Sequence, residues 1–500
     1  MNQQPPARIV ILGGGTAGWI AANLLAKAWG QGGTKVILVE SPDVGIIGVG
    51  EGSTPQLRAF FRDLGLVEAD WMPRCNATYK NGITFKGWSD RPGFESYFHP
   101  FATDLDSRSF DSFTYNTRAR RTGRDVWAHP DRFFLPALLS AKRLGPIAGQ
   151  NFPFDVSYGY HFDAHLVGGV LRDHALSSGV EHLARHVVTV DVAENGEVVA
   201  LLTKDRERIA GDVFIDCSGF RGSIMQEALR ERFIPFADNL FNDSAVVMPT
   251  AADPSGTNPH TSATALSAGW AWDIPLTNRT GNGYVYASGY LDKDAAETEL
   301  RAHLGLLDSD VAARHLQMKV GRIERSWVGN CLAVGLSQGF IEPLEATALH
   351  IVQATVEGFI KRYETGERDR FNSEITDRYE GIRDYIVGHY RLNRRTDTPY
   401  WRDNAANHNL SDNLKTLMTS WFRGEDLSAT VADLDISQYY SSLSWHCLFA
   451  GYGIFPPDEK IMPPGDDIAH FDMDAIDDFW ARCAMNYGDH KVFLDALHTI

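Results

Sequence analysis

The stretch RIVILGGGTAGWIAANLLAKAWG, residues 8–30, contains a short apolar run, a glycine turn and a helix-like segment in direct succession. The apolar run RIVIL is typical of a parallel strand that is buried on both faces. The helix-like segment ends at Gly30, and KVILVE (35–40) has the composition of a second buried strand. This order of strand, turn, helix and strand predicts the start of a doubly wound α/β sheet.

The glycine turn matches the pattern GxGxxG, which is a fingerprint of dinucleotide binding when it joins a strand to a helix. Glycine at these positions allows a tight turn, close approach of a pyrophosphate and helix–strand packing, and the helix N-terminus faces the phosphates. Glu40 ends the second strand, where an acid binds a ribose hydroxyl. The glycines alone would also fit an ordinary turn. The turn residues proposed to bind the cofactor are Gly13, Gly15, Thr16, Ala17 and Gly18.

Other segments resemble further parts of a nucleotide-binding domain. The runs GDVFIDCSGF (211–220) and CLAVG (331–335) predict two more buried strands, and 186–203 predicts a β-hairpin around ENGE. The glycine-dense segment GIIGVGEGSTP (45–55) suits close approach of the backbone to a ligand. Residues 160–179 are predicted to be helical. A second GxGxxG for NAD(P)H does not occur, so the chain is expected to bind flavin without reducing it.

Composition limits the classes of partner. The chain has 500 residues and a net charge of −17, which argues against nucleic acid and anionic membranes as partners. Its five cysteines form no CxxC pair, so neither a disulfide framework nor a metal site is expected. The N-terminus resembles neither a secretory signal nor a transmembrane span, and a cytoplasmic enzyme is the default expectation.

The segment IEPLEATALH (341–350) places a carboxylate beside glycines. Apolar residues at Leu349, Val352 and Val356 predict a helix after Pro343, with Glu345 at its start. A glutamate there is either a partner of the helix dipole or a catalytic base.

Several of these strings together resemble the flavin-dependent tryptophan halogenases, over most of the chain. The resemblance rests on GGGTAGW, GVGEGSTP, ATYKNGITFKGW (77–88), YHFD (160–163), FIDCSGFRG (214–222), GWAWDIP (269–275) and NCLAVGLSQGFIEPLEAT (330–347). It implies an α/β fold as a single compact unit, with a two-part, Rossmann-like FAD-binding domain of the flavin monooxygenase type and a helical substrate lobe. We expect the FAD-binding part at 1–100 and 150–365, with an inserted sheet, and the mostly helical substrate-binding lobe at 101–149 and 366–500.

The resemblance also implies the reaction. In this family a separate NAD(P)H-dependent reductase supplies FADH2, and oxygen then forms a flavin hydroperoxide. Halide attacks the hydroperoxide to give hypohalous acid, which reaches a lysine beside the aromatic substrate. The lysine falls on Lys80 and a catalytic glutamate on Glu345. An ammonium can deliver the electrophile, and a carboxylate can stabilise the cationic ring and remove its proton.

The remaining site residues follow from the same resemblance. The backbone N–H groups of Thr347 and Ala348 are expected to bind the halide, bromide or chloride. Trp270 and Trp272 are expected to shield the flavin, although as bare residues they fit one face of a strand. Further flavin contacts are expected at Gly48, Val49, Gly50, Val187, Leu336 and Leu349.

The substrate side departs from the family pattern. FHPF (98–101) supplies His99 and Phe101 for stacking on an indole, but the segment 433–453 is shorter than in tryptophan halogenases. The glutamate and tryptophan that hold the amino-acid part have no clear counterpart there, and Tyr439, Tyr440 and Trp445 are candidates. Because burying a zwitterion without paired charges is costly, we expect indole or a larger aromatic as substrate rather than free tryptophan.

A second departure is Ala346, which follows the glutamate at a position where tryptophan halogenases often have serine. A flavin-dependent aromatic monooxygenase and a non-catalytic FAD-binding sensor remain alternatives. Oligomeric state is open, with a homodimer as one option.

Overall fold

The computed structural model describes residues 3–43, 50–465 and 471–497. The glycine turn joins the central strand β1 (Arg8–Leu12) of a six-stranded sheet to helix α1 (Thr16–Trp29), as the sequence predicts. The strand order of that sheet is β21 (Trp327–Val328), β22 (Cys331–Ala333), β13 (Val213–Asp216), β1 (Arg8–Leu12), β2 (Lys35–Glu40) and β9 (Glu181–Ala184). All its pairs are parallel except β21–β22, so the four buried strands predicted from the sequence belong to one sheet.

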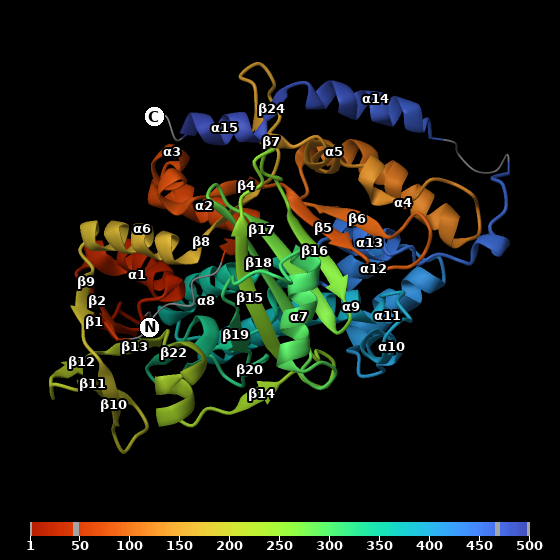
Figure 1. The fold of residues 1–500 in the computed structure, drawn as a ribbon. Coiled ribbons are helices and arrows are strands. Elements are labelled where there is room, and N and C mark those ends of the chain that lie inside the picture. Colours follow the sequence, from red (N-terminus) through yellow and green to blue (C-terminus); the bar gives the residue numbers. More distant parts are fainter. Residues whose placement is uncertain (1–2, 44–49, 466–470, 498–500) are drawn as a thin grey trace.

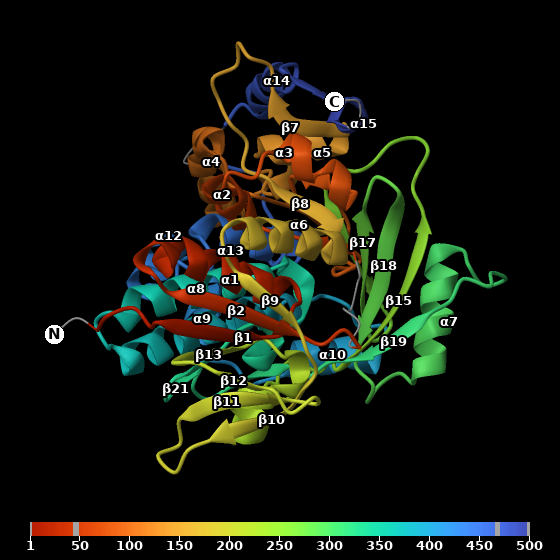
Figure 2. The ribbon, with the colours of Figure 1, turned by 90° about the vertical axis from the view of Figure 1, so that its left-hand side faces the viewer.

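Both faces of this sheet are covered, which explains why its strands are continuously apolar. Ile9 and Ile11 of β1 face the side of helices α1 (Thr16–Trp29), α6 (Ala164–Ser177) and α8 (Ala348–Tyr363). Val10 and Leu12 pack on the other side, in the cluster that includes Val198 and Leu201. That side is covered by the small sheet β10 (Val187–Val192), β11 (Val198–Thr203) and β12 (Arg208–Ala210), which contains the predicted hairpin (Figure 2).

A second, seven-stranded sheet stands beside the first (Figure 1). Its order is β19 (Arg314–Gln317), β15 (Ser244–Ala251), β18 (Arg279–Tyr286), β17 (Gly269–Pro275), β16 (Thr261–Leu266), β5 (Gly82–Lys86) and β6 (Ser96–Pro100). Helix α7 (Lys293–Leu304) packs on it. A three-stranded sheet, in the order β3 (Gly50–Gly52), β8 (Gly159–Asp163) and β4 (Thr78–Lys80), contacts β17 and β18 through β3.

Most remaining elements are helices. They are α2 (Pro55–Leu64), α3 (Glu68–Trp71), α4 (Ser107–Arg121), α5 (Leu135–Ala141), α9 (Arg368–Arg391), α10 (Pro399–Ala406), α11 (Asp412–Phe422), α12 (Leu427–Asp433), α13 (Ser442–Gly451), α14 (Met473–Ala484) and α15 (His490–Leu497). Short strands complete the fold: β7 (Leu144–Ala148) pairs with β24 (Tyr487–Asp489), and β20 (Gly321–Ile323) lies between β14 (Phe233–Pro235) and β23 (Gly339–Phe340).

The two segments assigned to a helical lobe approach each other in space. Leu135 and Leu139 of α5 share a core cluster with Trp480 of α14. The C-terminal helices therefore lie next to α4 and α5, although several hundred residues separate them in the chain (Figure 1). The exact domain boundaries remain a prediction.

Two local predictions were wrong. Residues 160–163 form strand β8, and the helix begins only at Ala164, where the Asp163 side chain accepts hydrogen bonds from the first helical N–H groups. The helix after Pro343 also begins later than predicted. Pro343–Glu345 form a short 3-10 turn, Ala346 is left-handed at φ +55°, and α8 starts at Ala348. Glu345 therefore lies outside the first turn of α8.

In the part of the chain that the structure describes, helices long and apolar enough to cross a membrane do not occur. The five cysteines are free thiols.

The glycine turn gives a prediction about stability. A Cβ on Gly18 would lie 1.9 Å from the carbonyl oxygen of Gly13, whereas a Cβ on Gly169 in α6 would meet nothing within 4 Å. We expect Gly18→Ala to lower the free energy of unfolding by about 3 kcal/mol, because the backbone must shift. The matched variant Gly169→Ala should raise it by about 0.5–1 kcal/mol. Urea unfolding without cofactor measures both, and equal stabilities would contradict the tight packing.

Candidate active site

The glycine turn has the shape that a dinucleotide cofactor needs. Gly13 has φ +116°, and a Cβ there would lie 2.2 Å from the carbonyl oxygen of Cys217. A Cβ on Gly14 would lie 2.2 Å from the Glu40 carboxylate, so this acid sits directly against the turn. Gly15 is the N-cap of α1 and has open space around its Cβ position, which is where a phosphate can approach the helix N-terminus. The glycine turn and Glu40 therefore suit the pyrophosphate and the ribose of FAD.

A second segment joins this turn from far along the sequence. Gly335 has φ +72°, and a Cβ there would lie 2.8 Å from Cβ of Ala17, so the turn before Leu336 packs directly on α1. The hydroxyl of Thr16 donates to the carbonyl of Ala164 (3.3 Å). The two predicted flavin segments therefore meet at the start of α1.

The other predicted flavin contacts differ in burial. Leu349 is buried in the first turn of α8, whereas Leu336 and Val187 are half-buried. Gly50 begins β3 and packs against Ile274 of β17. Gly48 and Val49 lie outside the described residues.

Lys80 and Glu345 come from distant segments and are both buried. Lys80 ends β4 and is 0% exposed, and Glu345 ends the 3-10 turn and is 5% exposed. Burial lowers the pKa of Lys80 to about 8, while the negative charge of Glu345 opposes that shift. Burial raises the pKa of Glu345, and His99 and Lys80 oppose that shift. Each charge affects the pKa of the other, so the predicted pair lies close together in the interior.

A histidine that sequence reasoning missed holds Glu345 in place. His389 of α9 is fully buried, and its Nε2 lies 3.0 Å from Oε1 of Glu345. Its Nδ1 lies 2.7 Å from the hydroxyl of Tyr452. Burial lowers the pKa of His389 to about 3, so the neutral ring donates from Nε2 to the carboxylate and accepts from Tyr452. His389 sits on an apolar helix face, where the usual interpretation is a core residue.

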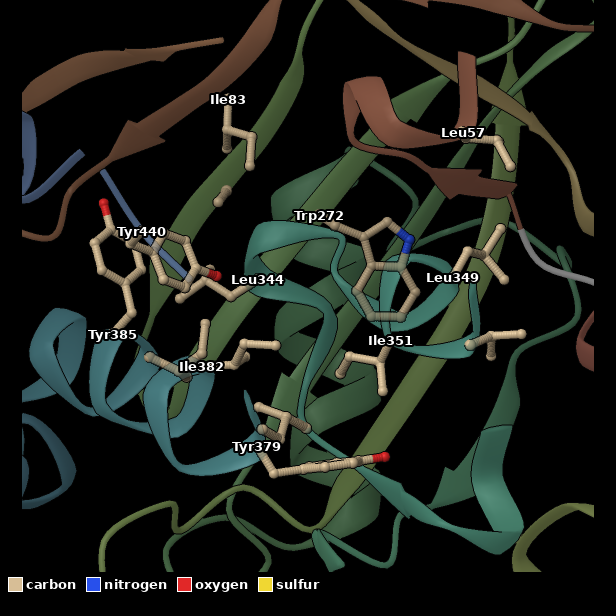
Figure 3. Packing of buried hydrophobic residues seen from close by; sticks show 14 of the residues in the cluster. Leu57, Ile83, Trp272, Leu344, Leu349, Ile351, Tyr379, Ile382, Tyr385 and Tyr440 are labelled. Carbon is tan, nitrogen blue, oxygen red and sulfur yellow. The ribbon is translucent and has the colours of Figure 1, made fainter. Parts of the chain in front are cut away.

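Aromatic rings enclose the space beside this pair. The ring of Phe101 lies 5.4 Å from the ammonium of Lys80, and His99 lies 6.1 Å from the ring of Tyr385. Tyr440 stacks on Tyr385 with centroids 3.6 Å apart, and Trp445 meets the edge of Tyr385 at 4.8 Å. Tyr385, which no pattern in the sequence singled out, therefore contacts His99, Tyr440 and Trp445. Figure 3 shows its ring stacked against that of Tyr440.

The adjacent candidate Tyr439 points elsewhere. A Cβ on Gly381 of α9 would lie 2.2 Å from the ring of Tyr439, so this tyrosine packs on the helix surface.

Burial lowers the pKa of His99 to about 4, so its ring is neutral. Within the described residues, three buried polar atoms around the rings have no hydrogen-bond partner: Nδ1 of His99, the hydroxyl of Tyr440 and Nε1 of Trp445. Such atoms are available to a polar group of a bound aromatic compound.

The predicted halide amides lie at the start of α8. Thr347 is the N-cap and Ala348 is the first helical residue. The first N–H groups of a helix have no partner within the helix, so they suit an anion. Ala346, in the left-handed conformation, lies between these amides and Glu345 and ends the 3-10 turn, so the chain changes direction there.

The tryptophan pair lies on one face of strand β17. Trp272 is on the other side of Leu344 from the ring pair Tyr385 and Tyr440 (Figure 3). Nε1 of Trp270 donates to the buried carboxylate of Glu342 (3.0 Å). Trp272 lies flat over β18, because a Cβ on Gly283 would be 2.2 Å from its ring. Leu349 lies next to Trp272 (Figure 3). Trp272 is thus on the side of the predicted flavin contact Leu349, away from Tyr385 and Tyr440 (Figure 3).

The comparisons with known proteins agree with this geometry. The family model described as tryptophan halogenase matches residues 8–464. The tryptophan 6-halogenase SttH of Streptomyces toxytricini is 38% identical over 432 residues, covering 81% of this chain and 82% of the relative. Its crystal structure superposes with a TM-score of 0.85 at 32% identity, over 99% of this chain and 100% of that one. BrvH, a flavin-dependent halogenase from Brevundimonas sp. BAL3, gives a TM-score of 0.83 at 31% identity over 99% of both chains.

The burial of Lys80 predicts a pH-dependent stability. The unfolded side chain has a pKa near 10.5 and the folded one near 8, so the cost of burying the ammonium is complete below pH 8. It falls as pH rises towards 10.5, because the folded state loses the proton first. Lys80→Met should therefore be more stable than the wild-type protein by about 3 kcal/mol at pH 7, with the difference vanishing near pH 10.5.

Urea unfolding of both proteins across this pH range measures the difference. The exposed lysine at the start of α7 provides the control, and Lys293→Met should show no such trend. A difference that stayed constant with pH would mean that Lys80 does not titrate in this window.

Proposed function

Since the chain belongs to the tryptophan halogenase family and is therefore a flavin-dependent halogenase, we propose that it halogenates indole or another neutral, electron-rich aromatic with bromide or chloride. The observation that supports this most directly is the buried pair Lys80 and Glu345 beside a set of neutral rings. Bound reduced FAD would supply the oxidation of halide by oxygen to hypohalous acid. The glycine turn, Glu40 and the segments at Gly335 and Leu349 would hold the cofactor.

The proposed roles of the two buried charges follow from their chemistry. The ammonium of Lys80 donates a hydrogen bond to the hypohalous acid and holds the electrophilic halogen near the ring. Attack by the ring on the halogen breaks the halogen–oxygen bond, and the departing hydroxide takes a proton from the Lys80 ammonium and leaves as water. The carboxylate of Glu345 stabilises the cationic arene and then removes the ring proton, so the pair of residues gains one proton and loses one. His389 supports this role, because its N–H keeps one carboxylate oxygen fixed.

The proposed anion site and the shield separate the reagents. The N–H groups of Thr347 and Ala348 bind halide at the start of α8. Trp270 and Trp272 keep organic compounds away from the flavin, which disfavours transfer of oxygen to the substrate. With one dinucleotide fingerprint in the chain, a separate NAD(P)H-dependent reductase supplies the reduced flavin.

The neutral surroundings support a substrate without charges. Tyr385, Tyr440 and Trp445 are neutral, and His99 has a pKa of about 4. A zwitterion placed among them would lose its water without gaining paired charges. An indole N–H, by contrast, needs one acceptor, and the unpaired Nδ1 of His99 or hydroxyl of Tyr440 can supply it.

A product assay tests the reaction. Purified protein, FAD, a flavin reductase, NADH, oxygen, bromide and indole should yield a product whose mass spectrum carries the bromine isotope pattern. Lys80→Met should lower the turnover rate about 1000-fold and Glu345→Gln about 100-fold, with FAD affinity preserved, because general acid–base and electrostatic contributions have these magnitudes. Lys293→Met, at an exposed lysine, serves as the matched control.

Two outcomes would overturn the proposal. A product heavier by one oxygen atom would identify an aromatic monooxygenase instead. FAD binding without any product from indole or a panel of larger arenes would favour the sensor.

A substrate series tests the predicted neutrality. Indole, 3-methylindole, tryptamine and tryptophan share one ring and differ in charge. We expect kcat/KM to fall at least tenfold from 3-methylindole to tryptophan, because the zwitterion must be desolvated. A higher kcat/KM for tryptophan than for indole would show that the site holds an amino-acid group.

A further inference from the structure

The ammonium of Lys80 is surrounded by few groups that can fix its direction. In the described part of the chain its Nζ has no hydrogen-bond partner, although the residue is fully buried. The residue after Glu345 is Ala346, whose methyl group cannot accept a hydrogen bond. The charge of Glu345, from the 3-10 turn, acts on the pKa of Lys80, and the charge of Lys80 in turn lowers the pKa values of His99 in β6 and His161 in β8.

A chain of three buried hydrogen bonds leads towards this ammonium from the other side. The hydroxyl of Thr78 donates to the carbonyl of Pro275 (2.7 Å). Nδ1 of His161 lies 3.0 Å from Oγ1 of Thr78, and its Nε2 lies 2.9 Å from Oγ1 of Thr261. Thr78 is two residues before Lys80 on β4, so both side chains point to the same face of the sheet.

The direction of every bond in this chain is forced. A carbonyl oxygen only accepts, and a hydroxyl carries a single hydrogen, so Thr78 has donated its hydrogen to Pro275 and must accept from His161. His161 therefore carries its proton on Nδ1. Burial, and the charge of Lys80 after it, keep the pKa of His161 well below its ordinary value, so Nε2 is unprotonated and accepts. Thr261 must then donate to His161, which leaves its oxygen with lone pairs only.

The oxygen of Thr261 faces the same small space as the ammonium. A Cβ built on Gly52 would lie 3.1 Å from Nζ of Lys80, 3.4 Å from Oγ1 of Thr261 and 3.6 Å from the ring of His161. Gly52 is paired with His161 in the sheet, and its missing side chain leaves this space open. The flexible lysine can thus approach an oxygen whose hydrogen is already committed elsewhere.

We propose that His161 and Thr261 are positioning residues for Lys80. The series of hydrogen bonds from Pro275 through Thr78 and His161 directs the hydroxyl hydrogen of Thr261 to Nε2 of His161. The Thr261 oxygen can therefore only accept a hydrogen bond from the Lys80 ammonium. This arrangement favours the charged form of Lys80 and directs its N–H groups, which the proposed halogenation requires. The inference rests on the proposed role of Lys80 and adds residues that do not touch the reacting atoms.

Two nearly isosteric variants test the proposal. Thr261→Val removes the acceptor itself. Thr78→Val removes the acceptor for Nδ1–H of His161 at the far end of the chain, which frees the ring to protonate Nε2 and turn the Thr261 hydrogen towards Lys80. Both should lower the pKa of Lys80, and Thr261→Val by about one to two units, the range expected for a lost hydrogen bond to a charge. Thr261→Ser, which keeps the hydroxyl, should restore it.

The first measurement is independent of activity. NMR titration of lysine labelled with 13C at Cε, with the Lys80 signal identified by its absence in Lys80→Met, gives the pKa in each variant. The second measurement is the pH profile of bromination, whose alkaline limb should move down with the Lys80 pKa and return with Thr261→Ser. A merely structural role would lower the rate at all pH values without moving this limb.

The outcomes separate the inference from the proposed function. An unchanged Lys80 pKa in both folded valine variants overturns the inference, even if bromination depends on Lys80. A lowered pKa in a protein that brominates nothing supports the hydrogen-bond chain and removes the proposed function. If Thr261→Val fails to fold, Thr78→Val and Thr261→Ser still decide the question through the NMR titration.

Discussion

Burial of the Lys80 ammonium beside the Glu345 carboxylate is the constraint on which the site depends. Both side chains have lost their water, so the surrounding structure must fix their positions to offset the cost. Strand β4, which carries Lys80, pairs with β8 and is also held by the C-terminal helix α15, because the N–H of Tyr79 donates to Nε2 of His490 (3.2 Å). Glu345 is held by His389 of α9. Strand β4 and helices α9 and α15, which are far apart in the sequence, therefore together hold these two buried charges.

The histidines around the pair act as neutral connectors. Burial lowers the pKa values of His99, His161 and His389, so none adds a positive charge that would compete with Lys80. A neutral imidazole has one donor and one acceptor, and each of His161 and His389 uses both. His161 and His389 connect the backbone carbonyl of Pro275 and the hydroxyl of Tyr452 to the surroundings of Lys80 and Glu345, and they add no charge.

Local patterns in the sequence predicted the parts of the fold that depend on local chemistry. The strands β1, β2, β13 and β22 are apolar on both faces and are followed by turns, so their runs were recognisable. Strand β8 (Gly159–Asp163) was missed because five residues that lead directly into a helix are too few to show a periodicity of their own. The delayed start of α8 was missed because a left-handed alanine is set by its packing and not by its propensity.

Site residues were predictable only where they stand in a recognisable string. Lys80, Glu345 and the tryptophan pair lie in such strings, and the structure buries the first two close enough to affect each other's pKa. Tyr385, His389 and Thr261 stand outside these strings, and their places depend on contacts between distant segments. His161 stands in the string YHFD, but its bonds to Thr78 and Thr261 also depend on such contacts. Thr261, for example, reaches His161 only because β16 pairs with β5 beside the sheet of β4 and β8. The pairing of strands that are far apart in the chain cannot be predicted from the spacing of residues in the sequence.

The short segment 345–349 shows how one turn of chain can serve three purposes. Glu345 faces the rings and Lys80, Thr347 and Ala348 present N–H groups at a helix start, and Leu349 lies towards Trp272 (Figure 3). A continuous helix from Pro343 would have engaged the 347 and 348 amides as donors to earlier carbonyls. The left-handed Ala346 ends the 3-10 turn, costs about 1 kcal/mol, and lets a new helix begin with free amides directly beside the carboxylate. Backbone strain at one residue thus allows the proposed halide amides of Thr347 and Ala348 to follow Glu345 within three residues of chain.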